Sequence, residues 1–153
     1  SGSQVGYDVS PFAERTIVHG GKQSMPFKYN NEAAPFYSEA ERTFSPVQDW
    51  TVNGVDTLVL FVRGGAGNGA GRVYLAVTDA SNRTAVVVHP NAELATTSKW
   101  TEWAIPLSDL TGAGVNATRI KTLYIGVGDR ANPAAGGAGM LYIDDIYLMK
   151  VTN

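Results

Sequence analysis

Two adjacent aspartates interrupt an apolar stretch near the end of the sequence, at residues 141–148. β-Branched and aromatic residues dominate this stretch and glycines precede it, so it predicts a β-strand. Because side chains alternate along a strand, Asp144 and Asp145 face opposite ways and at least one of them points inward. Ile146 and Leu148 share a face with Asp144, so we expect Asp144 on the buried side.

A buried carboxylate is costly unless a cation, an arginine or several backbone N–H groups pair with it. The sequence leaves two interpretations of this acid pair open. One is a bound metal ion or a buried knot of hydrogen bonds. The other is a solvated edge position, or an acid whose partners are purely structural.

The side chains that catalysis needs are not grouped in this sequence. His19 and His89 are far apart, and the spacings typical of a catalytic transition-metal site do not occur. Asp144 and Asp145 cannot flank one glycosidic bond, because adjacent strand residues face apart. The glycine-rich run at 64–69 lacks the Gly-Lys-Ser/Thr of a phosphate-binding loop. We therefore predict a non-enzyme, with an unrecognised catalytic site as the weakest alternative.

The bulk composition describes one globular domain. The chain has 153 residues, 44% hydrophobic and 17% charged, which suits a single core. We expect one module over residues 1–153, with residues 1–4 either a linker or a cloning remnant. The net charge of −2 gives no reason to expect nucleic acid or a membrane as a partner. The absence of cysteine excludes disulfides and thiolate metal sites.

Short apolar runs broken by Gly, Asn, Asp and Pro dominate the sequence, and helical periodicity is nearly absent. This pattern predicts an all-β fold, either a sandwich or a barrel of antiparallel strands. Ser81-Asn82 is expected to turn a hairpin. Residues 106–110 are expected to form a single helical turn. The expected strands cover residues 25–29, 38–44, 57–63, 72–78, 84–89, 100–105, 121–127 and 141–148.

The two faces of these strands differ in composition. One face is aliphatic throughout, and we expect it to form the core together with Trp103 and Ile105. The opposite face carries aromatic rings, an arginine and an acid. Rings stack on sugar C–H groups and planar polar groups reach paired hydroxyls, so we expect one sugar-binding surface. Its predicted residues are Arg63, Tyr74, Glu102 and Tyr124, with His89 at the margin. The alternative is that a strand or loop of the module, or a neighbouring domain, covers this face.

Several segments, taken in order, resemble galactose-binding-like jelly-roll modules of the carbohydrate-binding-module type. Modules of this kind are found in large secreted multidomain bacterial proteins, often beside laminin-G-like domains. The segments that carry the resemblance are 18–25, 49–50, 63–64, 100–109, 125–130 and 142–146.

The resemblance implies an antiparallel β-sandwich of the jelly-roll type and a non-catalytic function. Such a module binds polysaccharide or oligosaccharide and attaches a larger secreted or surface protein to it. We therefore expect an extracellular or cell-surface location, a monomer, and other domains of the same polypeptide as partners. The alternative is a structural or adhesion domain of the same fold that binds no sugar.

The resemblance also implies a structural calcium ion on the side of the sandwich opposite the glycan groove. Its ligands resemble an acid of an N-terminal strand, carbonyl groups of a turn, and the acid of the final strand. The expected metal residues here are Gly21, Lys22, Asp144 and Asp145. No acidic strand precedes Val5, so the N-terminal ligand would come from Asp8 or Glu14.

Overall fold

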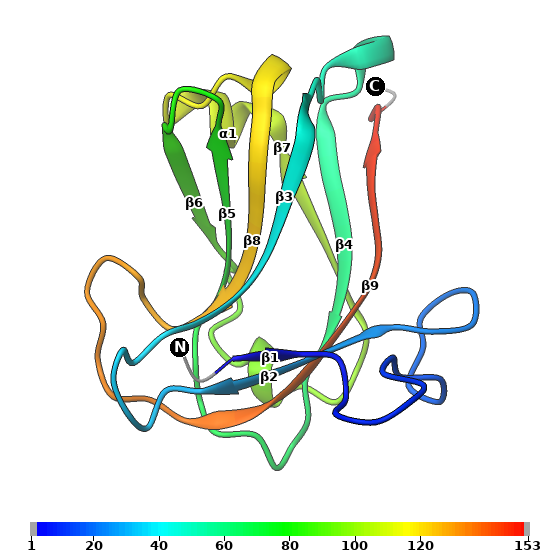
Figure 1. The fold of residues 1–153 in the computed structure, drawn as a ribbon, viewed down its shortest axis with the longest axis vertical. Helices are drawn as coiled ribbons and strands as arrows, with labels where there is room; N and C mark the ends of the chain where they lie inside the picture. The colour runs from blue at the N-terminus through cyan, green and yellow to red at the C-terminus, as the bar shows by residue number, and fades with distance from the viewer. Residues whose placement is uncertain (1–2, 152–153) are drawn as a thin grey trace.

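The computed structural model describes residues 3–151, which form two antiparallel sheets packed face to face (Figure 1). One sheet has five strands in the order β1-β2-β9-β4-β7, and the other has four in the order β3-β8-β5-β6. The predicted all-β antiparallel sandwich is therefore confirmed. The strands are β1 (Gln4–Val5), β2 (Met25–Asn30), β3 (Ser38–Gln48), β4 (Thr57–Arg63), β5 (Val73–Asp79), β6 (Thr84–Val88), β7 (Thr101–Pro106), β8 (Ile120–Val127) and β9 (Ala138–Met149).

In residues 3–151, helical structure is confined to short connections between strands. The predicted turn after β7 is the α-helix α1 (Leu107–Gly112). Three 3-10 turns complete the set: η1 (Val52–Gly54), η2 (Leu94–Thr96) and η3 (Ala117–Arg119). Within residues 3–151, none of the helices has the length and apolar character needed to cross a membrane.

The core lies between the two sheets and uses the aliphatic faces that alternation predicts. Trp50 also lies in this core, and its side chain is only 4% exposed. Burying each large apolar side chain contributes roughly 1.5–3 kcal/mol of stability. Gln4 pairs with Lys28, so residue 4 belongs to the sheet and not to a linker. The predicted core residues that are buried are Leu58, Leu60, Leu75, Val77, Trp103, Ile105, Ile125 and Val127.

Alternation breaks in the middle of β9, and this corrects the expected orientation of Asp144. Asp144 pairs with Phe61 and Tyr147 pairs with Val59, so two residues of β9 oppose one residue of β4. Such a bulge shifts the alternation by one residue. Asp145 takes the positive φ of 49° that the bulge requires. Asp144 therefore lies on the outer face with Phe61, although Leu148, four residues later, packs against the core.

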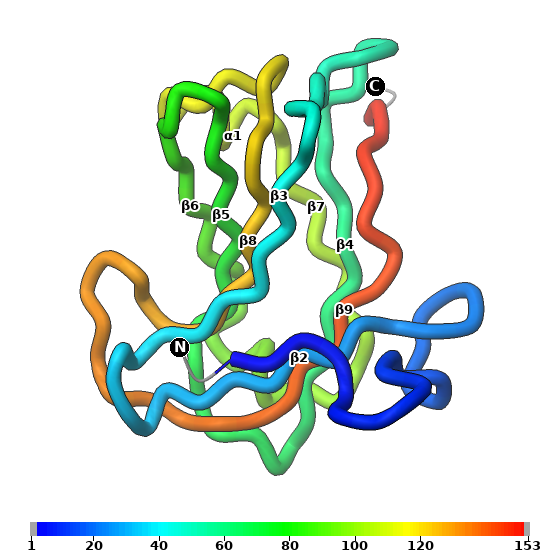
Figure 2. Tube along the Cα trace, in the orientation of Figure 1, coloured from blue at the N-terminus to red at the C-terminus, as the bar shows by residue number. Residues whose placement is uncertain are grey.

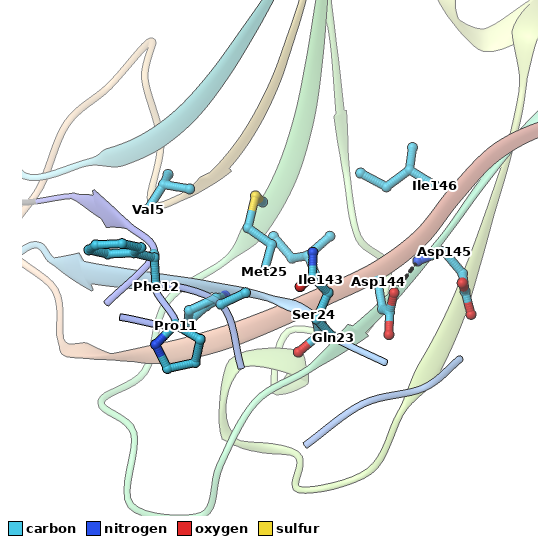
Figure 3. Close-up of a pocket in the computed structure, with 13 residues that line it drawn as sticks. Val5, Pro11, Phe12, Gln23, Ser24, Met25, Ile143, Asp144, Asp145 and Ile146 are labelled. Carbon is cyan, nitrogen blue, oxygen red and sulfur yellow. Dashed lines mark hydrogen bonds between the residues drawn. The ribbon is translucent and has the colours of Figure 1, made fainter. Parts of the chain in front are cut away.

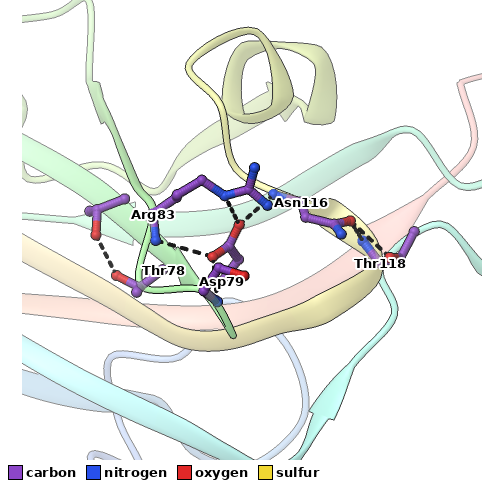
Figure 4. Close-up of polar contacts among 7 residues, drawn as sticks. Thr78, Asp79, Arg83, Asn116 and Thr118 are labelled. Carbon is purple, nitrogen blue, oxygen red and sulfur yellow. Dashed lines mark hydrogen bonds and ion pairs between the residues drawn. The ribbon is translucent and has the colours of Figure 1, made fainter.

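A fully buried acid ties the β5–β6 hairpin to η3 (Figure 4). Asp79 Oδ1 accepts hydrogen bonds from the backbone N–H groups of Ser81 (2.8 Å) and Arg83 (3.1 Å). Asp79 Oδ2 accepts from Arg83 Nε (2.8 Å) and from the N–H of Asn116 (2.9 Å). Burial raises the pKa of Asp79, but these N–H groups and the guanidinium outweigh it and lower the pKa to about 2.

Candidate functional site

The predicted binding residues divide between the two outer faces of the sandwich. Arg63 and Glu102 belong to β4 and β7 of the five-stranded sheet, where Phe61 pairs with Glu102 on the outer face. Tyr74 and Tyr124 belong to β5 and β8 of the four-stranded sheet. The inner faces of the two sheets pack on one core, so the outer faces point in opposite directions. The structure therefore does not bring these residues together on one surface.

His89 lies on neither outer face. It is 5% exposed, and its ring packs edge-on against Trp103 of the core with 5.0 Å between ring centroids. Burial lowers the pKa of His89, and a hydrogen bond from the N–H of Asn91 to its Nδ1 (3.1 Å) fixes the ring. The predicted position at the margin of a sugar-binding surface is therefore wrong.

A loop of the same module covers part of the five-stranded outer face. Figure 2 shows the long connection between β1 and β2 looping out beside β9. The His19 ring from this connection stacks on Phe61 with 3.6 Å between centroids and 16° between planes. His19 Nδ1 lies 2.7 Å from Asp145 Oδ2. A loop of the module therefore covers Phe61. The sequence left this open as the alternative to a sugar-binding face.

Backbone N–H groups of the same loop donate hydrogen bonds to Asp144, the final-strand acid that was expected to bind calcium. Asp144 Oδ2 accepts from the backbone N–H groups of His19 (2.9 Å) and Gly20 (3.2 Å), and Oδ1 accepts from the N–H of Asp145 (2.8 Å). Calcium needs carboxylate and carbonyl oxygens with free lone pairs. Gly21 and Lys22 are exposed in the adjoining turn.

The predicted alternative acids near the N-terminus are likewise not arranged around a cation. Glu14 accepts from the Tyr7 hydroxyl and from the N–H groups of Thr16 and Ile17, and these bonds lower its pKa to about 2. Asp8 accepts from Gln4 Nε2. Across residues 3–151, no cluster of three or more His, Cys, Asp or Glu side chains could hold a metal ion. These acids are therefore hydrogen-bonded within the chain, and calcium at this corner stays a prediction from the sequence.

A hollow of about 560 Å³ lies beside this corner (Figure 3). Its labelled walls are largely apolar and include Val5, Phe12, Met25 and Ile146. The nearby Asp144 carboxylate is committed to backbone N–H groups. Ligand sites combine apolar walls with a few convergent polar groups, and the four-stranded outer face meets that description better.

The four-stranded outer face consists of three rows of side chains that cross all four strands. Register fixes the rows, because directly paired residues lie side by side on one face. The first row is Glu39, Gly126, Tyr74 and Val88. The second is Glu41, Tyr124, Ala76 and Val86, and the third is Thr43, Thr122, Thr78 and Thr84.

A chain of polar and aromatic contacts runs over these rows. Tyr74 Oη donates to Glu39 Oε1 (2.7 Å), and Arg130 Nε lies 3.2 Å from the same oxygen. The Arg130 guanidinium carbon stands 4.9 Å from the centre of the Tyr124 ring, within cation–π distance. Within the part of the chain that the structure describes, Arg130 Nη1 is buried and has no hydrogen-bond partner. A buried donor without a partner is costly.

Tyr74 supports this arrangement from below the surface. Its side chain is 1% exposed, and a methyl group at Gly126 would lie 2.3 Å from its ring. Burial raises the pKa of Tyr74 far above its usual range, and the bond to Glu39 raises it further. Tyr74 therefore positions Glu39 and Arg130, and the predicted role as an exposed stacking ring is wrong.

A cavity of about 320 Å³ opens above the first row, within the usual size range of ligand sites. Alternation could place Tyr124 beside it, but it could not find Arg130, which lies in the β8–β9 loop. The signal for Arg130 in the sequence was its position three residues after the end of β8. The cavity is lined by Arg72, Tyr74, Val86, Val88, Gly128, Asp129 and Arg130.

Residues 5–150 match the family described as Carbohydrate binding domain 30. No curated protein matches the chain. A solved family 30 carbohydrate-binding module shares 15% identity, with a TM-score of 0.66 and coverage of 99% of this chain and 92% of that one. A family 11 module from Clostridium thermocellum, solved with a β-1,3-1,4-mixed-linked tetrasaccharide, shares 13% identity with a TM-score of 0.61, over 98% of this chain and 85% of that one.

An exo-β-agarase is also similar in structure, with 11% identity and a TM-score of 0.68. The match covers 100% of this chain and 23% of the agarase chain. At these identities the likeness shows a shared fold.

Proposed function

The chain belongs to the carbohydrate-binding domain 30 family, and we propose that its glycan binds on the outer face of the four-stranded sheet, beside Tyr124 and Arg130. The single observation that carries this placement is the cavity of about 320 Å³ on this face, which is lined by Arg130, whose guanidinium stands 4.9 Å from the Tyr124 ring centre. The Tyr124 ring and two half-exposed valines, Val86 and Val88, supply apolar surface next to it.

The chemistry of this face suits a sugar ring. A sugar has C–H faces that pack on aromatic and aliphatic surface, and hydroxyls that accept from a guanidinium or donate to a carboxylate. Arg130, Glu41 and Tyr124 offer these groups on neighbouring strands and an adjoining loop. The Glu39 bond holds the Arg130 side chain in place before a ligand arrives, which reduces the entropy lost on binding.

Mixed-linked β-1,3-1,4-glucan is the glycan we propose for this face. The family 11 module that is similar in fold was solved with a tetrasaccharide of that polymer. The structural or adhesion alternative, without sugar binding, has no observation in its favour.

The module's role in a larger protein is part of the same proposal. It would hold a secreted or cell-surface bacterial protein on polysaccharide, without chemistry of its own and as a monomer beside other domains. Support comes from the agarase, in which a similar fold spans about a quarter of a longer chain. Neither nucleic acid nor a membrane is a proposed partner.

Matched substitutions on the two outer faces test the placement of the site. Tyr124→Ala and Arg130→Lys remove the ring and the planar guanidinium from the proposed face. Tyr147→Ala and Arg63→Lys make the same changes on the five-stranded sheet. Stacking and charge-assisted bonds contribute about 1 kcal/mol or somewhat more each, so we expect each site variant to weaken binding about five- to tenfold.

Isothermal titration and affinity electrophoresis with soluble mixed-linked glucan measure the effect. The two control variants should bind as the parent does, and circular dichroism should show all four folded. Weakened binding in the Tyr147 and Arg63 variants alone would move the site to the five-stranded sheet. A parent that binds no polysaccharide in a panel would refute the proposal.

A further inference from the structure

We propose that the glycan cleft continues past the edge of the four-stranded sheet into a second pocket, which binds a further sugar residue. This inference rests on the proposed function, because it assigns a subsite to the same cleft. The pocket lies at the end of the sandwich among the loops that follow β4, β6 and β8.

The second pocket is large and adjoins the first. Its volume is about 540 Å³, compared with about 320 Å³ for the cavity on the sheet. Arg72, Gly128 and Asp129 line both cavities, so they form the shared wall. The other lining residues are Asn31, Ala70, Gly71, Ala92, Glu93, Asn132, Ala134, Ala135 and Gly136.

Hydrogen bonds within the chain hold the loops of this pocket together. The N–H of Gly136 donates to the carbonyl of Asn31 (2.9 Å), and the N–H of Gly137 donates to the carbonyl of Ala70 (3.0 Å). The side chain of Asn31, which is 1% exposed, donates through Nδ2 to the carbonyl of Val127 (2.9 Å). The pocket is thus formed in advance, which lowers the cost of binding.

The walls and rim of this pocket suit a neutral sugar residue. Alanine and glycine residues form much of the wall, and their small size leaves room for a sugar ring inside the pocket. Arg72 lines the pocket and donates to the carbonyl of His89 through one terminal nitrogen (3.3 Å). Asp129 Oδ1 accepts from the N–H groups of Ala131 and Asn132. A hydroxyl can accept from the guanidinium and donate to Asp129 Oδ2 or to Glu93, so both charges gain a partner.

The dependence of affinity on glycan length tests the subsite. Titration calorimetry with mixed-linked β-glucan oligosaccharides, from disaccharide to octasaccharide, gives Kd at each length. The parent should bind more tightly with length until both pockets are filled. Ala134→Trp fills the second pocket, so its Kd should stop improving at a shorter length. We expect it to bind the longest oligosaccharide about tenfold more weakly than the parent does, and the shortest within about twofold.

Matched variants separate this effect from damage to the fold. Ala104→Trp changes another exposed alanine, which lies on the five-stranded sheet, and should reproduce the parent at every length. Ala92→Trp fills the second pocket from its other wall, and it replaces Ala134→Trp if that variant fails to fold.

The outcomes distinguish the subsite from the site itself. If the parent binds and the filled variants follow its curve at every length, the second pocket is not a subsite and the proposed function stands. If the parent binds no length of this or any other glycan, the proposed function fails and the subsite fails with it.

Discussion

Tyr74 is a tyrosine on an outer sheet face that nevertheless behaves as part of the interior. Its ring is 1% exposed and its hydroxyl bonds to Glu39. Tyr74→Ala should therefore cost about 3–5 kcal/mol in the free energy of unfolding, as for other large buried aromatics. Tyr74→Phe keeps the ring and should cost about 1 kcal/mol for the lost hydrogen bond. Urea denaturation measures both variants. Equal stability of parent and Tyr74→Ala would show that the ring is not packed as described.

The Asp144 carboxylate accepts hydrogen bonds from backbone N–H groups, and these bonds bear on whether calcium raises the thermal midpoint. A ligand that binds only the folded form raises its stability by mass action. Because three N–H groups already occupy the Asp144 carboxylate, we expect equal thermal midpoints in chelator and in excess calcium. Differential scanning calorimetry with Asp144→Asn as the comparison measures this. A midpoint that rises with calcium in the parent but not in the variant would establish the calcium site predicted from the sequence.

At the scale of strands, alternation predicted the elements well and their grouping poorly. It found all the strands except the two-residue β1, and it identified the aliphatic inner faces, because one-sided burial leaves a period of two in the sequence. It misplaced Asp144 because the bulge in β9 shifts the alternation without changing the composition. It also could not tell that β4 and β5 belong to different sheets, because the sheet that a strand joins depends on long-range pairing.

The β5–β6 hairpin depends on Asp79, so it should respond to acid. The Asp79 pKa of about 2 lies below the unfolded value near 4, so its contribution to stability is complete above about pH 4. That contribution is lost as the pH falls through the folded pKa toward 2. Glu14, whose pKa is also lowered to about 2, adds to the same acid sensitivity.

Asp79→Asn should test this dependence. The variant should lower the thermal midpoint by several degrees at pH 7. The reason is that the amide nitrogen of Asn would face Arg83 Nε and the N–H of Asn116, two donors that now bond to Asp79 Oδ2. It should also flatten the fall in midpoint between pH 4 and pH 2. Thermal unfolding followed by circular dichroism across this range measures both effects. An unchanged pH profile in the variant would assign the acid sensitivity to other carboxylates.

At the scale of the whole molecule, the two sheets have different outer surfaces. The long β1–β2 connection covers Phe61 on the five-stranded side, where His19 and the two aspartates hold it in place. The β8–β9 loop instead brings Arg130 over the four-stranded side, where one cavity lies on the sheet and a second lies among the adjoining loops. Composition could predict a mixed aromatic and polar face, but which sheet a loop covers follows from the path of the chain.

The positions of the three tryptophans allow a test, on the whole module, of which outer face binds the glycan. Trp50 and Trp103 are buried in the core, and Trp100 lies beside His19 on the five-stranded side. None of them lines the cavity on the four-stranded sheet or the pocket among the adjoining loops. Glycan binding that calorimetry detects should therefore leave the tryptophan emission and the three indole N–H resonances almost unchanged. The amide resonances of Tyr124 and Arg130 should shift in the same titration. If the Trp100 indole shifts with saturation and Tyr124 does not, the glycan lies on the five-stranded face instead.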